Sequence, residues 1–318
     1  MGFRRREVIG FYMSKTAFIC PGQASQIVGM GKDLYAAFPE ARERFQQADE
    51  LMREPLSRIC FEGPEEKLKQ TQFTQPALFV HSAVVADLLA KRGVLPDMAA
   101  GHSLGEYSAL YAAGALSFHS ALQVVIIRGR GMQNAGETNP GLMAAVMGLE
   151  EERIREICGE ASSAGVVQPA NFNSPGQVVL SGSVAGVRRA MEIAKTAGAK
   201  LVKELVVSGA FHSPLMEPAR ESLFEALDRL EIAKPSCPVY SNVSATPTQD
   251  PEQIRLRLKE QLLSPVLWYQ SVEAMIRDGA ERFLEIGPGQ VLIGLLKRIR
   301  REAIGIPVGT AAEVNALQ

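Results

Sequence analysis

The segment Gly101-His102-Ser103-Leu104-Gly105 has the residue types and the G-x-S-x-G spacing of a nucleophile elbow. A short stretch of small apolar residues precedes it, and residues 106–116, which are rich in Ala, Leu and Tyr, follow it. This order predicts a strand, a sharp turn and a helix, which together expose a serine hydroxyl for attack on an acyl group. Ser103 would lie at a helix N-terminus, where the N–H of Leu104 faces the group under attack. The alternative is an ordinary strand-helix turn with a chance serine.

A serine hydroxyl is a weak nucleophile and needs a base, for which the chain offers four histidines. His102 adjoins Ser103 on a tight turn and should point elsewhere, His81 lies within an apolar helix, and His119 starts a helix. His212 follows the serine in chain order, as the base does in α/β-hydrolases, so we predict His212 as the base. No acid clearly occupies the place of a third catalytic residue, but a backbone or amide carbonyl can hold the Nδ1 proton instead.

Arg128 stands beside the apolar run 124–127, in a segment whose pattern predicts a helix over 120–133. An arginine in such a place usually lays its apolar stem along the core or pairs with an acid. The alternative is a charge placed against an anionic ligand. The residues alone leave both interpretations open.

Composition excludes several classes of function. The 318 residues allow one large domain or two unequal ones, and a hydrophobic fraction of 46% is ample for a buried core. Lysines and arginines number 34 against 35 acids, so no overall field favours nucleic acid or an anionic membrane, and neither is an expected partner. The longest apolar runs, such as 77–90, are interrupted by residues like His81 and Asp87 and are too short to cross a bilayer.

The cysteines and glycines point to no cofactor or metal. No CxxC spacing occurs, which favours free thiols in a reducing compartment, and hence a cytoplasmic location, over disulfides or a metal site. The turn Gly287-Pro288-Gly289 lacks a third glycine at the spacing of a dinucleotide fingerprint, because Gly294 is too far along. We interpret it as a strand-helix turn. The four cysteines are Cys20, Cys60, Cys158 and Cys237.

Strands alternating with helices predict an α/β fold whose main sheet is mostly parallel and covered on both faces. Residues 140–208 interrupt this pattern with the order strand, helix, two strands, helix, strand, which is that of a ferredoxin-like unit. We therefore expect an N-terminal tail over 1–12, a catalytic domain built from 13–139 and 209–318, and an inserted subdomain over 140–208. The expected elements of the insert are strands 142–147, 166–171, 177–181 and 200–207 and helices 150–163 and 184–197.

Several motifs taken together resemble one family, malonyl-CoA:acyl-carrier-protein transacylase with the related acyltransferase domains of polyketide synthases. The resemblance extends over residues 16–309, and it implies an α/β-hydrolase-like core with a ferredoxin-like insert. One departure is Ala24, where the family often has glycine. The motifs, in chain order, are residues 21–26, 101–107, Arg128-Gly129 with Met132-Gln133, residues 171–176, 209–213 and 285–289.

The resemblance also implies a role for each matching residue. Ser103 would be the acylated nucleophile and His212 its base, oriented by the main-chain carbonyl of Gln261. The N–H groups of Gln23 and Leu104 would form the oxyanion hole. The substrate-binding residues would be Arg128, as a clamp on the malonyl carboxylate, with Asn171 and Phe211.

The implied activity is transfer of a malonyl group from malonyl-CoA to the phosphopantetheine thiol of acyl carrier protein. The route is a ping-pong reaction through malonyl-Ser103 that supplies fatty-acid synthesis, in a protein that we expect to be a monomer. Three alternatives remain: an acyltransferase that serves a polyketide synthase, an acyl thioester hydrolase, and a non-catalytic acyl-CoA binder. Arg128 and the missing triad acid speak against a simple lipase.

Two further expectations concern specificity and docking. Phe211 either forms a wall that disfavours an α-methyl branch on the acyl group or simply packs in the core. Acidic carrier proteins require a basic surface, and of two basic clusters we favour the one in the insert, although either is more often just a solvated helix face. The insert cluster is Arg188, Arg189, Lys195 and Lys200, and the other is Lys297, Arg298, Arg300 and Arg301.

Overall fold

The computed structural model describes residues 15–317, so the predicted tail over 1–12 lies outside the described residues. Its larger sheet has six strands, of which all but the last pair in parallel. The predicted mixed α/β fold with a mainly parallel sheet is confirmed. In spatial order the strands are β10 (Ile304–Val308), β9 (Ala280–Ile286), β1 (Lys15–Cys20), β2 (Met98–Gly101), β7 (Val239–Tyr240) and β8 (Pro247–Thr248).

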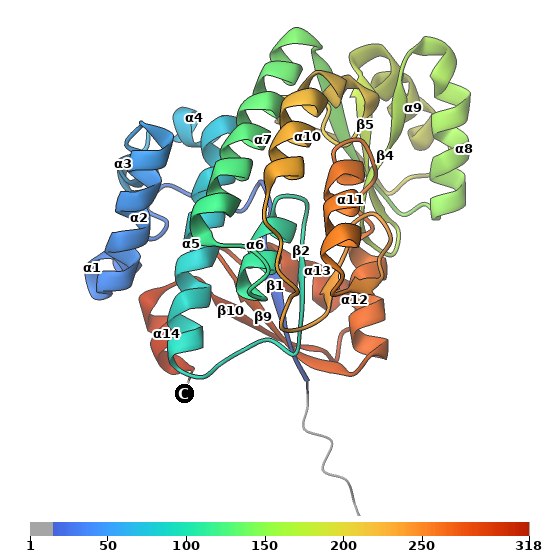
Figure 1. Ribbon diagram of the computed structural model, residues 1–318. Helices are drawn as coiled ribbons and strands as arrows, with labels where there is room; N and C mark the ends of the chain where they lie inside the picture. Colours follow the sequence, from blue (N-terminus) through green and yellow to red (C-terminus); the bar gives the residue numbers. More distant parts are fainter. Residues whose placement is uncertain (1–14, 318) are drawn as a thin grey trace, which may run out of the picture.

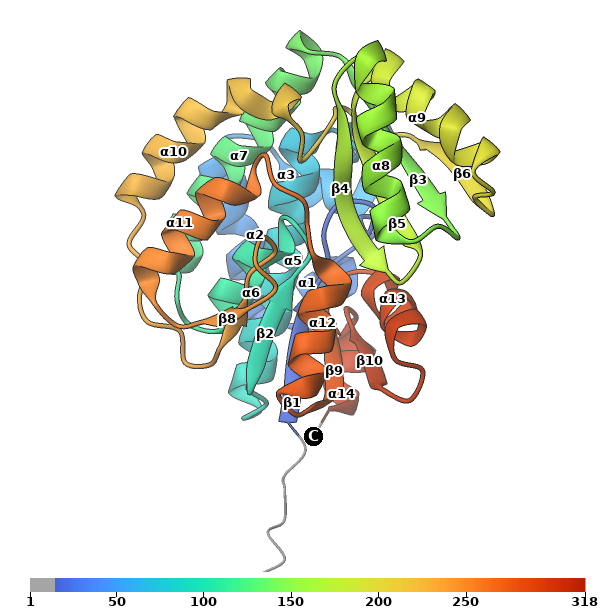
Figure 2. The same ribbon diagram turned by 90° about the vertical axis from the view of Figure 1, so that its right-hand side faces the viewer.

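Different helices cover the two faces of this sheet (Figures 1 and 2). They are α1 (Lys32–Ala37), α2 (Pro39–Met52), α3 (Leu56–Glu62), α4 (Glu65–Leu68), α5 (Thr71–Lys91), α6 (Gly105–Ala112), α7 (Phe118–Thr138), α10 (Arg220–Arg229), α11 (Pro251–Gln261), α12 (Trp268–Arg277), α13 (Val291–Ile299) and α14 (Ala311–Ala316). Phe18 and Cys20 pack with α5, α6 and α7, whereas Ala17 and Ile19 pack with α12 and α13. Burial on both faces explains why residues 17–20 of β1 are all apolar.

The long helix α5 lies within the main apolar core, on one face of the six-stranded sheet. By length and composition alone it could cross a membrane, because an 18-residue window within it has a mean hydropathy of 1.3. However, 89% of that window is buried inside the protein. The helix begins at Thr71, contains Pro76 and extends beyond the apolar run 77–90 at both ends. A proline near the first turn removes only one backbone hydrogen bond, and packing on both sides compensates. Its apolar composition is thus explained by its place between α7 and the sheet.

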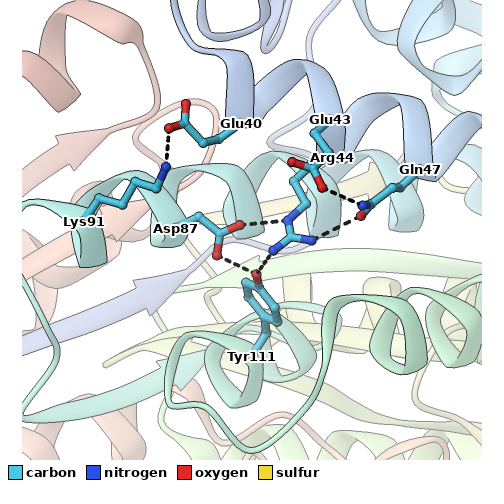
Figure 3. A network of polar contacts seen from close by, with 7 residues as sticks. All are labelled: Glu40, Glu43, Arg44, Gln47, Asp87, Lys91 and Tyr111. Carbon is cyan, nitrogen blue, oxygen red and sulfur yellow. Dashed lines mark hydrogen bonds and ion pairs between the residues drawn. The ribbon is translucent and has the colours of Figure 1, made fainter.

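A polar network ties α2, α5 and α6 together on the outer side of α5 (Figure 3). The Arg44 Nε atom lies 2.8 Å from the Asp87 carboxylate, and the Tyr111 hydroxyl donates to the same carboxylate. Arg44 also donates to the Tyr111 hydroxyl, at 3.2 Å. Lys91 pairs with Glu40 at the end of the same interface. The ion pair between Arg44 and Asp87 therefore joins α2 to α5, and the Tyr111 hydroxyl joins α6 to the same network.

The second sheet is separate and antiparallel, in the order β4-β5-β3-β6. Its elements match the predicted order, with small shifts at their ends. Helices α8 and α9 pack on it around Phe172, Leu180 and Ile154 (Figure 2). The elements are β3 (Gly141–Met147), α8 (Glu151–Ala161), the 3-10 helix η1 (Ser162–Ala164), β4 (Val167–Ser174), β5 (Gln177–Ser183), α9 (Val184–Thr196) and β6 (Leu201–Leu205).

Backbone hydrogen bonds join the second sheet to the segment that follows α11. The N–H of Phe172 donates to the carbonyl of Val266 at 2.9 Å, and the N–H of Val266 donates to the carbonyl of Ala170 at 2.9 Å. The next N–H, that of Leu267, donates to the carbonyl of Asn242 just after β7. Strand β4 is thereby fixed next to the carboxyl ends of the parallel strands.

One prediction about secondary structure was wrong, and one strand was missed. Pro214 favours a helix start, so the sequence predicts a single helix from Pro214 to Leu230. The structure has instead a 3-10 helix, η2 (Pro214–Ala219), followed by α10, because Pro218 cannot continue an α-helical ladder. Strand β10 was not predicted, since Gly305 and Pro307 weaken its strand pattern. It lies at the sheet edge, where a proline is tolerated.

Candidate active site

The predicted elbow is present between β2 and α6. Ser103 adopts a φ of 51°, in the left-handed region that L-residues rarely occupy. A Cβ atom on Gly101 would lie 1.9 Å from backbone atoms of Gly105, and one on Gly105 would lie 2.1 Å from the carbonyl oxygen of Cys20. Only glycine fits at both positions, which confirms the expected close approach of the backbone on either side. The packed turn holds the serine hydroxyl at the carboxyl end of the sheet.

His212 lies beside the serine, 109 positions away in sequence. Its Nε2 atom is 2.8 Å from the Ser103 Oγ atom, and its Nδ1 atom is 2.9 Å from the main-chain oxygen of Gln261. A carbonyl oxygen only accepts hydrogen bonds, so Nδ1 carries the proton and the Nε2 lone pair faces the hydroxyl. The geometry is that of a serine, a histidine and an orienting carbonyl.

The surroundings keep the imidazole of His212 neutral. Its side chain is buried, and burial together with the charge of Arg128 lowers its pKa to about 3. A neutral imidazole can accept a proton at physiological pH.

The other histidines lie where the sequence predicts. His102 turns its Nε2 atom to the Asn173 side chain, at 2.8 Å, and packs near Trp268. His81 is buried inside α5, where burial lowers its pKa to about 4, and His119 is exposed at the start of α7. Of the four, His212 is the one in contact with Ser103.

The guanidinium of Arg128 is fully buried and lies next to the nucleophile. It donates to the Oε1 atoms of Gln75 and Gln261, at 2.8 and 3.0 Å, and to the Ser103 Oγ atom at 3.1 Å. Within residues 15–317, no carboxylate oxygen lies within 4.0 Å of its nitrogens. Of the two interpretations left open by the sequence, pairing with an acid is therefore excluded for these residues. The charge is available to an anionic ligand.

Two backbone donors near Ser103 make no hydrogen bond to any residue from 15 to 317. At the elbow the N–H groups of residues 102, 103, 105, 106 and 107 are all paired, and that of Leu104 is not. The N–H of Gln23 is also unpaired, in a loop that approaches so closely that a Cβ on Gly22 would lie 2.5 Å from the His102 oxygen. Ala24 has a φ of 81°, which explains why glycine suits its position.

Three buried polar residues of the site were not predicted. The Asn242 side chain accepts from the N–H of Ser103 at 2.7 Å and donates to the carbonyl of Gly101 at 2.6 Å, so it clamps the elbow. The Glu106 carboxylate accepts from the Gln261 side chain at 2.8 Å and from the N–H of Asn242 at 3.1 Å. Gln75 binds Arg128. The sequence could have indicated Glu106, because it is the one charged residue in a helix rich in Ala, Leu and Tyr. Nothing in the sequence distinguishes Asn242 from a surface asparagine.

Two residues that the resemblance implied have less direct placements. Asn171 is 7% exposed, and no hydrogen bond within residues 15–317 joins its side chain to Ser103, His212 or Arg128. Phe211 is 6% exposed, directly before His212, and belongs to the main apolar core. Contact of either residue with a substrate stays a prediction.

Comparison with known proteins gives one consistent result. Residues 17–313 match the family model of the acyl transferase domain. The malonyl CoA-acyl carrier protein transacylase of Bacillus subtilis is 47% identical over 297 residues, which cover 93% of this chain and 94% of the relative. The solved transacylase of the same name from Coxiella burnetii superposes with a TM-score of 0.92 at 40% identity, over 95% of this chain and 96% of that one.

A third relative was solved together with a partner. It is a malonyl-transacylase in complex with the acyl-carrier protein of a type II polyketide synthase. This chain superposes on that structure with a TM-score of 0.91 at 41% identity, over 95% of this chain and 98% of that one. The chain belongs to the acyl transferase domain family and, within it, to the malonyl-CoA:acyl-carrier-protein transacylases.

Proposed function

We propose that this acyltransferase moves a malonyl group from malonyl-CoA to the phosphopantetheine thiol of acyl carrier protein, through a malonyl-Ser103 intermediate. One observation carries the proposal: the Ser103 Oγ atom lies 2.8 Å from the Nε2 atom of His212 and 3.1 Å from a nitrogen of Arg128. The hydroxyl of the nucleophile thus contacts both its base and a cation that has no carboxylate partner within residues 15–317. The names of the relatives supply the two substrates.

In the first half-reaction His212 takes the proton of Ser103 as the Oγ atom attacks the thioester carbonyl. The negative charge that develops on the carbonyl oxygen is stabilised by the unpaired N–H groups of Leu104 and Gln23. Losing one such donor typically costs about 3 kcal/mol of activation free energy. The tetrahedral intermediate collapses, the thiolate of CoA leaves and takes the proton from His212, and the malonyl ester of Ser103 remains.

In the second half-reaction the thiol of the carrier protein attacks this ester. His212 takes the thiol proton and returns it to the Ser103 oxygen as the ester bond breaks. The same two backbone donors stabilise the second tetrahedral intermediate. At the end of the reaction Ser103 is free and the malonyl group is on the carrier protein.

Arg128 selects acyl groups that carry a carboxylate. A planar guanidinium can meet a carboxylate through two parallel hydrogen bonds. With an acetyl group the buried charge would have no anionic partner, which is unfavourable. Phe211, in turn, would restrict space beside the α-carbon, so malonyl is favoured over methylmalonyl. Phe211→Ser should raise the methylmalonyl rate relative to malonyl, and an unchanged ratio assigns Phe211 to core packing.

Hydrolysis is the second candidate, because the same serine and histidine could pass the acyl group to water. The test is CoA release from malonyl-CoA with and without holo acyl carrier protein. Transfer predicts one rapid equivalent of CoA followed by a slow rate, and continuous turnover when the carrier protein is added. Continuous turnover without the carrier protein would favour the hydrolase. Carrier proteins from fatty-acid and polyketide synthesis, compared side by side, distinguish the two pathways.

We propose the basic cluster of the insert as the docking surface for the carrier protein. Its side chains are exposed, but Arg188 pairs with Glu204 at 3.1 Å and Arg189 with Glu192 at 3.0 Å, whereas no ion pair within the described residues involves Lys195 or Lys200. Charge reversal at Lys195 and Lys200 should therefore raise the KM for carrier protein and leave that for malonyl-CoA unchanged. An equal rise in both would contradict the assignment, and Lys297→Glu is the matched control in the second cluster.

The finer organisation is part of the same proposal. We assign an α/β-hydrolase-like catalytic domain to residues 13–139 and 209–318 and a ferredoxin-like subdomain to 140–208. The passage of the chain from α7 into β3, and from β6 back to η2, supports these boundaries. Four buried free cysteines favour a cytoplasmic location. We propose a monomer, which light scattering in solution can test.

A further inference from the structure

Glu106 is a buried acid for which the proposed reaction has no use. Its side chain is 3% exposed, and its carboxylate accepts hydrogen bonds from the Gln261 Nε2 atom and from the N–H of Asn242. Burial raises its pKa to about 7, while these hydrogen bonds and the charge of Arg128 act in the opposite direction. A buried carboxyl group costs stability unless its contacts compensate. Its partners therefore indicate what it does.

The side-chain amide of Gln261 is bonded at both ends. Its Nε2 atom donates to Glu106 at 2.8 Å and to the main-chain oxygen of Ser103 at 3.1 Å. Its Oε1 atom accepts from Arg128 at 3.0 Å. Turning the amide by 180° would direct an NH₂ group at the guanidinium and an oxygen at the carboxylate. Both contacts would then be repulsive, because neither pair would contain a donor and an acceptor.

We propose that Glu106 is a positioning residue for acyl-group selection, which fixes the orientation of the Gln261 amide and thereby holds the guanidinium of Arg128 beside Ser103. The inference rests on the proposed function, since it assumes that Arg128 binds the malonyl carboxylate. The Oε2 atom of Glu106 accepts both hydrogen bonds, from Gln261 and from the N–H of Asn242, so it favours the orientation that directs the NH₂ group of the amide at it.

The main-chain carbonyl of Gln261 orients His212. Glu106 thus lies behind both the cation and the base, but through different atoms of Gln261. A side-chain defect should disturb the cation more than the base. Selection among acyl groups should consequently suffer more than the chemical step itself.

The test is Glu106→Gln, which keeps the shape but can donate as well as accept. Residue 106 then no longer selects the orientation of the Gln261 amide, and only the contacts with Arg128, the Ser103 carbonyl and Asn242 oppose the turned one. The rates of acylation by malonyl-CoA and by acetyl-CoA are measured separately by rapid quench. We expect the malonyl-to-acetyl ratio to fall by about tenfold or more, with the acetyl rate changed by less than about threefold. An unchanged ratio, or an equal loss of both rates, overturns the proposal.

Gln261→Met tests the proposal without relying on the folding of the first variant. It retains the carbonyl that orients His212 and should lower the ratio to a similar extent. Glu106→Gln added to Gln261→Met should change the ratio by less than about twofold, because the amide through which it acts is gone. An unchanged ratio in Gln261→Met, or a full tenfold further loss in the double variant, would contradict the mechanism.

Glu285→Gln is the matched control. Glu285 is also a buried acid, and it accepts the N–H groups of Leu292 and Ile293 at the start of α13. Its loss should lower the melting temperature and leave the malonyl-to-acetyl ratio unchanged. A similar fall in the ratio would overturn the proposal. Acylation of the unaltered protein by malonyl-CoA tests the proposed function separately, whatever the variants show.

Discussion

Two arginines, Arg44 in the network of Figure 3 and Arg128 beside the elbow, show how differently this molecule treats a partly or fully buried cation. The Arg44 side chain is 27% exposed and pairs directly with Asp87 at 2.8 Å. Arg128 is 1% exposed, and its hydrogen bonds within residues 15–317 go to uncharged groups of Gln75, Gln261 and Ser103. The more deeply buried charge is thus the one without a counter-ion.

The difference separates a structural cation from a binding cation. At Arg44 the protein supplies both charges, and the interaction is complete when the chain has folded. At Arg128 burial without a direct carboxylate is unfavourable for the free protein, and burial lowers the pKa of the guanidinium. A ligand carboxylate would complete the pair. We therefore expect changes at the elbow to alter chemistry and selection, and changes in the network of Figure 3 to alter stability alone.

The largest effect is expected at the base. His212→Ala removes the acceptor of the Ser103 proton, and comparable losses in serine enzymes reach about 10⁴-fold or more. Stopped-flow measurement of the acylation rate should show a loss of that order. Tyr111→Phe, in the other network, should leave the rate unchanged. A loss of less than tenfold in His212→Ala would mean that another group acts as the base.

The next largest effect is expected when each of the two arginines is replaced by lysine. Arg128→Lys keeps a positive charge but loses the planar pair of donors, so the malonyl-to-acetyl preference should fall by about 100-fold. Arg44→Lys makes the same chemical change in the network of Figure 3 and should leave the preference as it is. Competition between the two acyl-CoA substrates measures both. Equal effects of the two substitutions would abolish the distinction between a structural and a binding cation.

A smaller effect is expected from the buried His81, in the pH dependence of stability. Burial lowers the pKa of His81 to about 4, from about 6.5 in an unfolded chain. Between these values the unfolded chain binds a proton that the folded chain does not, so stability is lost as the pH falls from 6.5 toward 4. His81→Gln should reduce the slope of unfolding free energy against pH by up to about 1.4 kcal/mol per pH unit.

Urea titrations of the two proteins between pH 5 and 6 measure that slope. Other groups that titrate in this range, Glu106 among them, contribute equally to both proteins and cancel in the difference. Identical slopes would show that His81 binds its proton equally in the folded and unfolded chains, and would contradict the effect of burial.

The smallest effect is expected in the network of Figure 3. Asp87→Asn leaves Arg44 without its counter-ion, and because both side chains are about a quarter exposed, solvent limits the loss to about 1 kcal/mol of unfolding free energy. Acylation rates should not change. A loss of malonyl preference in this variant would link the two regions and contradict the comparison.

Local sequence predicted most of the elements and the part of the site that is local. The elbow was recognisable because Gly101, Ser103 and Gly105 lie within five residues. The orienting carbonyl of Gln261 came only from the family resemblance, since any residue offers a carbonyl. Asn242 had no signal, because it clamps the elbow from 139 positions away.

Elsewhere, packing and chain breaks outweighed local preference. Pro76 lies inside α5 because the surrounding core stabilises the helix on both sides of it, whereas Pro218 ends a 3-10 helix at the surface. Glycine and proline concealed β10 at the sheet edge. The sequence showed that Arg128 lies beside an apolar run, but its lack of a carboxylate partner depends on the position of every nearby acid. That fact required the fold.

The most direct test of the account is the site of acylation. The protein is mixed with malonyl-CoA in the absence of carrier protein, quenched within the first turnover, and analysed by mass spectrometry of the intact chain and of its peptides. The account predicts one malonyl group per chain, attached to Ser103 and absent from Ser103→Ala. Release of CoA without a covalent adduct, or an adduct that persists in Ser103→Ala, would contradict it.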